Sequence, residues 1–107
     1  MKEIMSSNVI VQKKFSMKKM LEIHQVAKKI NGTTYLYSKQ KTVDATVLPK
    51  LVSFLLTFEP QSTLKIIVEG TEAETNLEKL TTMLTNDASV VQIGNKRMLQ
   101  SPGSFQL

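Results

Sequence analysis

The stretch "NVIVQKKFSMKKMLEIHQVAKKING", residues 8–32, decides the fold class, because a strand gives way to a helix within it. "NVIVQKK" is a short β-branched run of the kind that forms strands. Ser16 is a good N-cap for a helix that runs to about Ile30. The apolar stripe of this helix repeats at intervals of three, four and three residues, and it consists of Met20, Ile23, Ala27 and Ile30. The chain therefore opens with a strand and an amphipathic helix.

The first turn of this helix carries Lys18 and Lys19 directly after Ser16 and Met17. Unpaired N–H groups already make this end of a helix partly positive, so cations are least welcome there. Two interpretations stay open. Either the lysines are solvated and cost little, or Ser16, the exposed N–H groups and Lys18 bind an anion such as phosphate, sulfate or a partner's carboxylate.

A hairpin and a second helix follow. Asn31-Gly32 ends the first helix, and we expect Gly32 to take the left-handed C′ conformation. "TTYLYS" (33–38) and "KTV" (41–43) predict a hairpin, although its turn, Lys39-Gln40, lacks the usual glycine. "VLPKLVSFLL" (47–56) fits a short helix, because its proline lies in the first turn.

The remaining elements are one strand and one helix. "LKIIVEG" (64–70) predicts a strand, and Thr71 and Glu74 form a T-x-x-E capping box ahead of a third helix. The apolar stripe of this third helix, again at helical spacing, consists of Ala73, Leu77, Leu80 and Leu84. The order β-α-β-β-α-β-α indicates an α+β open-faced sandwich, in which three helices cover one face of a four-stranded antiparallel sheet. We expect one domain over residues 1–86. Residues 87–107 form a C-terminal extension, in which "SVVQI" (89–93) is the one candidate edge strand and the rest is a flexible tail.

Composition excludes several classes of function. The 107 residues suffice for one domain, and no apolar run approaches the length of a membrane helix. The start, "MKEIMSSN", lacks the apolar core of a signal peptide, which predicts a cytoplasmic protein without a membrane partner. With no cysteine and one histidine, His24, we expect no disulfide, no metal site and no cofactor.

Charge is distributed unevenly along the chain. Residues 1–50 hold ten lysines against three acidic residues, and residues 51–107 hold four basic against six acidic residues. A basic half could attract nucleic acid, acidic lipid or an acidic protein face. No aromatic residue interleaves with the lysines as base stacking would need, so a solvated surface is favoured and nucleic-acid binding is the alternative.

Several local patterns resemble the histidine-containing phosphocarrier (HPr) family of the bacterial sugar phosphotransferase system, over roughly residues 5–86. They are "QVAKKI" (25–30), "KTVDA" (41–45), "LVSF" (51–54) and "EGTEAETNLEKL" (69–80), in the family's order and spacing. The resemblance implies a bacterial protein with the same open-faced sandwich.

The family's working segment resembles G-[IL]-H-A-R-P-A, in which the histidine carries a phosphoryl group. The matching stretch here is "KFSMKKM" (14–20), which places Ser16 at the histidine and Lys18 at the arginine. A serine hydroxyl is a poor nucleophile without a neighbouring base. His24 lies about 12 Å further along the helix axis and cannot replace the missing imidazole. The regulatory serine that some members carry falls here on Val47 or Pro49, neither of which accepts a phosphoryl group.

The resemblance therefore implies a divergent member that is not an enzyme and cannot carry phosphohistidine. Family precedent is that relatives without the histidine bind regulators, so we expect a regulatory module whose partner is a regulator or a phosphotransferase-system component. Residual phosphotransfer through Ser16 is an alternative. The family's docking face corresponds to Phe15, Ser16, Met17, Lys18, Lys19, Phe54 and Leu55.

Overall fold

The computed structural model describes the backbone of residues 3–99 and the side chains of residues 3–93. This part of the chain contains three helices and five strands. In chain order they are β1 (Glu3–Val11), α1 (Met17–Lys29), β2 (Gly32–Ser38), β3 (Lys41–Asp44), α2 (Leu48–Leu56), β4 (Ser62–Gly70), α3 (Ala73–Thr85) and β5 (Val90–Leu99).

The strands form one antiparallel sheet in the order β3-β2-β4-β1-β5. The β2–β3 hairpin turns through Lys39 and Gln40, which both have positive φ, as a type I′ turn requires even without glycine. The predicted hairpin is therefore correct.

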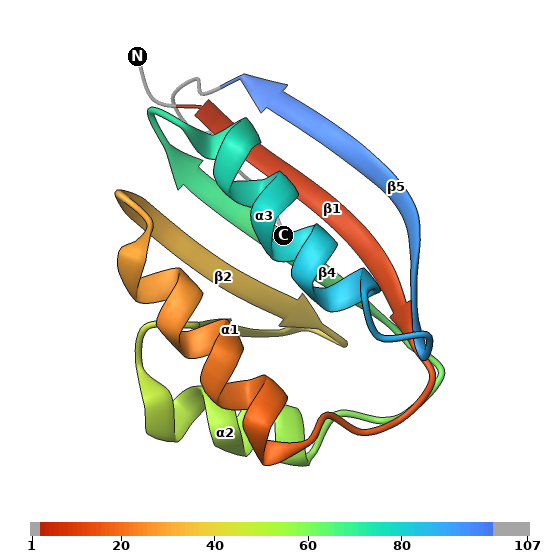
Figure 1. Cartoon of the computed structure of the whole chain (residues 1–107). Helices are drawn as coiled ribbons and strands as arrows, with labels where there is room; N and C mark the ends of the chain where they lie inside the picture. The colour runs from red at the N-terminus through yellow and green to blue at the C-terminus, as the bar shows by residue number, and fades with distance from the viewer. Residues whose placement is uncertain (1–2, 100–107) are drawn as a thin grey trace.

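All three helices lie on one face of the sheet: in Figure 1, α3 lies in front of the β1–β4 part of the sheet, and α1 runs alongside β2. Alternate strand residues such as Val9, Leu36 and Ile66 point into the core beneath them. The two apolar stripes predicted for the long helices are buried there: Met20, Ile23, Ala27 and Ile30 on one side, and Ala73, Leu77, Leu80 and Leu84 on the other. This arrangement is the predicted open-faced α+β sandwich.

The expected strand count of four is wrong, because β5 adds a fifth strand along β1. The candidate edge strand at residues 89–93 is present, and it continues to Leu99. Gly94 and Asn95 have low strand propensity, so the sequence alone suggested a tail there. Pairing with β1 overrides that propensity, since every residue from Glu3 to Val11 has a partner on β5. The part of the expected tail at 100–107 lies outside the described residues.

Two local predictions fail where α1 and β4 end. Gly32 is the first residue of β2 rather than a left-handed C′ cap, with φ of 151°. The proposed capping box is absent: Glu72 is the N-cap of α3, and its side chain makes no capping hydrogen bond. Thr71 cannot cap the helix because the chain needs both Thr71 and Glu72 to turn out of β4.

Candidate functional site

Ser16 caps α1 as the sequence predicts. Its backbone is extended, and its Oγ accepts a hydrogen bond from the backbone N–H of Lys19 at 3.1 Å. The first turn of the helix contains no acidic residue. A serine N-cap in this geometry stabilises a helix by about 1 kcal/mol.

Two lysines near this helix start are bound to the carboxyl ends of the other two helices. Lys19 Nζ donates to the carbonyl oxygen of Met83 on α3 at 3.4 Å and lies 3.5 Å from a carboxylate oxygen of Glu22. Lys14 Nζ donates to the carbonyl oxygen of Leu56, the last residue of α2, also at 3.4 Å. Neither α2 nor α3 has a basic residue in its own last turn. Lys14 and Lys19 therefore supply the cations that helix carboxyl ends favour.

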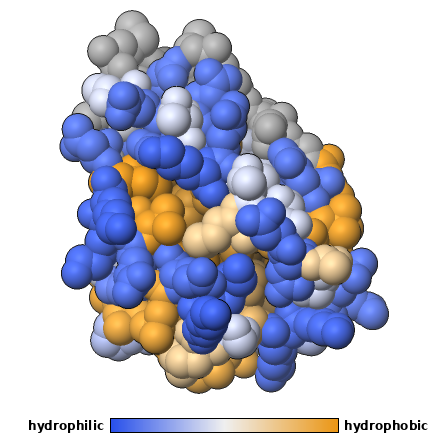
Figure 2. Space-filling view, in the orientation of Figure 1, coloured by the Kyte–Doolittle hydropathy of each residue, from blue (hydrophilic) through white to orange (hydrophobic). Residues whose placement is uncertain are grey.

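Exposed apolar side chains surround the same helix start. Met17 and Leu56 are each 52% exposed, and Leu21 is 40% exposed. Lys18 and Ser16 are exposed beside them. Figure 2 shows apolar surface between hydrophilic side chains at this lower end of the molecule, where Figure 1 places the start of α1 beside α2. We call Met17, Lys18, Leu21 and Leu56 the helix-end surface.

The remaining residues expected to dock a partner are less exposed than this surface. Phe15 is 8% exposed and its ring centroid is 6.4 Å from that of Phe58, while Leu55 is fully buried. Phe54 is half-buried. Phe15 and Leu55 therefore support the surface from the core and offer no area to a partner. Leu21 and Leu56 were missed by the sequence reasoning, although their positions outside the core stripes of α1 and α2 could have indicated them.

Among the described side chains, none lies within hydrogen-bond distance of Ser16 Oγ as a base that could activate it as a nucleophile. The Ser16 hydroxyl oxygen already accepts the capping hydrogen bond. His24 is half-buried two turns further along α1, and its Nδ1 lies 3.1 Å from the carbonyl oxygen of Ala45. Within residues 3–93, no group of three or more His, Cys, Asp or Glu side chains could hold a metal ion. The site thus consists of a capped helix end and exposed apolar groups.

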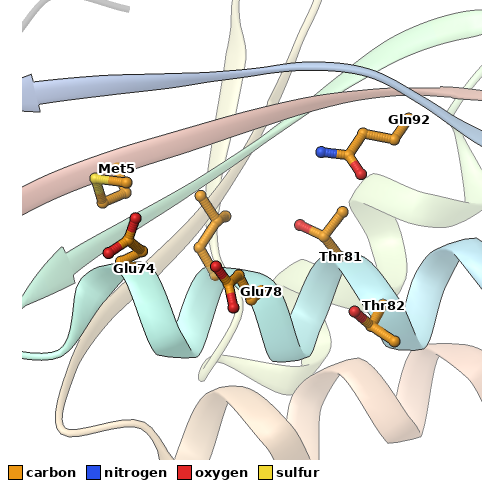
Figure 3. A pocket seen from close by; sticks show the side chains of 7 residues that line it. Met5, Glu74, Glu78, Thr81, Thr82 and Gln92 are labelled. Carbon is orange, nitrogen blue, oxygen red and sulfur yellow. The ribbon is translucent and has the colours of Figure 1, made fainter.

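A separate hollow of about 360 Å³ lies between α3 and the β1–β5 side of the sheet (Figure 3). Glu74 and Glu78 stand one helical turn apart at its rim, and Gln92 reaches it from β5. The buried Thr81 hydroxyl has no hydrogen-bond partner among the described residues. The two carboxylates would repel an anion such as phosphate, so this hollow is not a second anion-binding site.

The carboxyl end of α3 leads into a tight turn at Asp87. Its Oδ1 accepts hydrogen bonds from the backbone N–H and the hydroxyl of Ser89, at 2.9 and 2.8 Å. These two bonds lower the pKa of Asp87 below its ordinary value, and the nearby charges of Lys19 and Lys13 add to the effect. Lys19 therefore interacts with Asp87 as well as with the carbonyl oxygen of Met83.

None of the helices in residues 3–99 combines the length and apolarity that a membrane crossing requires.

Two solved structures share this fold. One is a histidine-containing phosphocarrier protein from Mycoplasma, with a TM-score of 0.71 and 10% sequence identity, covering 79% of this chain and 97% of that one. The other is the phosphocarrier protein HPr from Bacillus anthracis, with a TM-score of 0.64 and 24% identity, covering 75% and 95%.

No protein-family model and no curated protein matches the chain. The similarity therefore lies in the fold: the chain has the open-faced α+β sandwich of the phosphocarrier proteins, with a fifth strand in its sheet.

Proposed function

We propose that this chain with the phosphocarrier fold is a non-catalytic, regulatory protein that binds a protein partner through the helix-end surface. The partner is a phosphotransferase-system component or a regulator that recognises the corresponding end of a phosphocarrier. The observation that carries the proposal is the exposure of Met17, Leu21 and Leu56 around a helix start whose N-cap is a serine.

The surface has the composition of a protein interface. Its exposed side chains are a flexible methionine and two leucines, and methionine adapts readily to different partners. Lys18 is exposed at its rim, where a charge steers association more than it adds affinity. Phe15 and Leu55 hold the surface from below as part of the core.

A phosphoryl-carrying role is not part of this proposal. The only histidine in the sequence, His24, is half-buried beside Ala45 and is two helical turns from the helix start. Ser16 is used as a cap, and a hydroxyl needs a base to attack phosphorus at a useful rate.

Affinity capture from the source cells tests the docking role. We expect a captured protein to be lost by the double variant Met17→Glu and Leu21→Glu, because both charges fall within the helix-end surface. Val91→Glu is the matched control, since Val91 is a similarly exposed apolar residue on β5. Equal capture by the double variant, with both variants folded by circular dichroism, would place the interface elsewhere.

A further inference from the structure

The face of the sheet opposite the helices carries a row of side chains that are not part of the helix-end surface. Tyr37 on β2 lies directly opposite Lys65 on β4, which in turn lies opposite Asn8 on β1. Their chain neighbours Leu36, Ile66 and Val9 belong to the core under the helices. Because side chains alternate along strands, Tyr37, Lys65 and Asn8 share the opposite face.

Among the described residues, burial varies along this face. Ile4, Ser6 and Ile67 are buried on it, whereas Asn8, Tyr37 and Lys65 are half-exposed. Around these three residues the surface is hollowed, with a volume of about 290 Å³. The remaining lining residues are Ser38, Lys39, Ser62 and Thr63. The hollow lies at the end of the sheet where the β2–β3 hairpin turns.

The hollow combines an aromatic side chain, an amide and two ammonium groups. None of the described residues that line it is acidic. Lys39 is paired with Glu59 at 2.6 Å, but both side chains are more than half exposed. An exposed ion pair of this kind contributes little, so a phosphate can replace the carboxylate at small cost. The hollow therefore complements a ligand that is both aromatic and anionic.

We propose that this hollow binds single-stranded nucleic acid. One base stacks on the ring of Tyr37, the Asn8 amide hydrogen-bonds to its edge, and the flanking phosphates lie against Lys65 and Lys39. Stacking on an aromatic side chain at an open sheet face, combined with a basic groove, is how proteins hold single strands. A duplex keeps its bases stacked inside and cannot offer one to Tyr37. The interaction is independent of the docking surface, which lies on the helix side.

In the sequence, no aromatic residue interleaves with the lysines, but the sheet places an aromatic residue beside a lysine. Tyr37 and Lys65 are 28 positions apart in the chain, but strand pairing makes them neighbours.

Fluorescence anisotropy of the full chain with labelled oligo(U) and oligo(dT) of about ten nucleotides tests the proposal. We expect both single strands to bind at about 50 mM salt, with affinity falling as salt rises. Tyr37→Ala should weaken binding about tenfold, whereas Tyr37→Phe, which keeps the ring, should retain it. Lys65→Ala should weaken binding and reduce the log–log salt slope by about 0.7.

Lys41→Ala is the matched control. Lys41 belongs to the same hairpin, but it pairs with Ser38 and so lies on the helix side of the sheet, the side to which Leu36 points. Its single-strand affinity should remain that of the unchanged protein. The proposal is overturned if the unchanged protein binds neither strand, if a duplex of the same length binds as tightly, or if Tyr37→Ala binds normally. Should Tyr37→Ala not fold, Lys65→Glu tests the proposal instead: this variant should lose single-strand binding, and unchanged binding would overturn the proposal.

Discussion

Lys14 and Lys19 explain why positive charge surrounds the first turn of α1. Lys19 lies in the first turn of α1, where a positive charge is unfavourable. In the folded protein, however, its Nζ donates to the carbonyl oxygen of Met83 near the carboxyl end of α3, where a positive charge is favourable. Lys14 does the same for α2 at Leu56. Lysines around the start of α1 thus bind carbonyl oxygens at the ends of α2 and α3. The sequence suggested solvated lysines or an anion site, and it did not suggest this role.

Comparison of Lys19→Ala with Lys18→Ala tests this role of Lys19. Lys19→Ala should lower the free energy of unfolding by about 0.5–1 kcal/mol, because it removes a cation from the end of α3 and a largely buried stem. The side chain of Lys19 is only 18% exposed, whereas Lys18 is exposed. Lys18→Ala should therefore leave the free energy of unfolding within about 0.3 kcal/mol. Urea unfolding measures both, and equal losses for the two variants would contradict the assignment.

Asp87 gives the same region a pH dependence. Its pKa is lowered in the folded state, chiefly by the backbone N–H and hydroxyl of Ser89. The carboxylate therefore stabilises the fold above its ordinary pKa of 3.8, and this contribution is lost as the pH falls through the lower folded value. Asp87→Asn keeps an acceptor oxygen but no charge. Its melting temperature should lie below that of the unchanged protein at neutral pH, and the difference should shrink below the ordinary pKa; a constant difference would contradict this.

At the scale of elements, the junction of α1 and β2 depends on two glycines. Gly32 pairs with Gly70 at the end of β4, and both have positive φ. A Cβ on Gly32 would lie 2.1 Å from the backbone carbonyl oxygen of Glu69. The sequence predicted a glycine with an unusual backbone here, but it assigned the reason to a helix cap. The actual reason is the close approach of β4, a long-range contact that local pattern does not reveal.

Gly32→Ala should therefore lower the free energy of unfolding by about 2 kcal/mol or more, since both the backbone angle and the space oppose a side chain. Asn31→Ala is the control, because this neighbouring side chain is exposed and its loss should change stability by no more than about 0.5 kcal/mol. Chemical denaturation of the two variants makes the comparison. A Gly32→Ala protein as stable as Asn31→Ala would show that the junction can relax.

Elements with a strong period were predictable, and those that depend on distant partners were not. The stripes of α1 and α3 identified their buried faces, because helical spacing needs no knowledge of the rest of the fold. The capping box failed because its spacing said nothing of the turn that β4 requires. In the candidate site, Ser16 was correctly predicted as a cap, but no local signal linked Lys19 to Met83, 64 positions away.

At the scale of the whole molecule, β5 turns β1 from an edge strand into an inner strand. Val90 is buried in the core, and β5 pairs with β1 from Val11 to Glu3. A chain ending at Asn86 would expose that strand edge and the core beneath Val90. It should lose more than about 2 kcal/mol of unfolding free energy relative to the full chain.

A chain ending at Leu99 separates the effect of β5 from that of residues 100–107. If the chain ending at Asn86 unfolds at the same urea concentration as the chain ending at Leu99, the fifth strand is dispensable and the domain ends with α3.

The whole fold raises the proposal that a phosphocarrier-like sandwich serves here without carrying a phosphoryl group. Intact-protein mass spectrometry after incubation with phosphoenolpyruvate and the first enzyme of the phosphotransferase system is the decisive experiment, with a histidine-containing phosphocarrier as the positive control. We predict that the control gains a phosphoryl group while the mass of this chain does not change. A gain of one phosphoryl group by this chain would overturn the proposal, and its loss in Ser16→Ala would assign the phosphoryl group to Ser16.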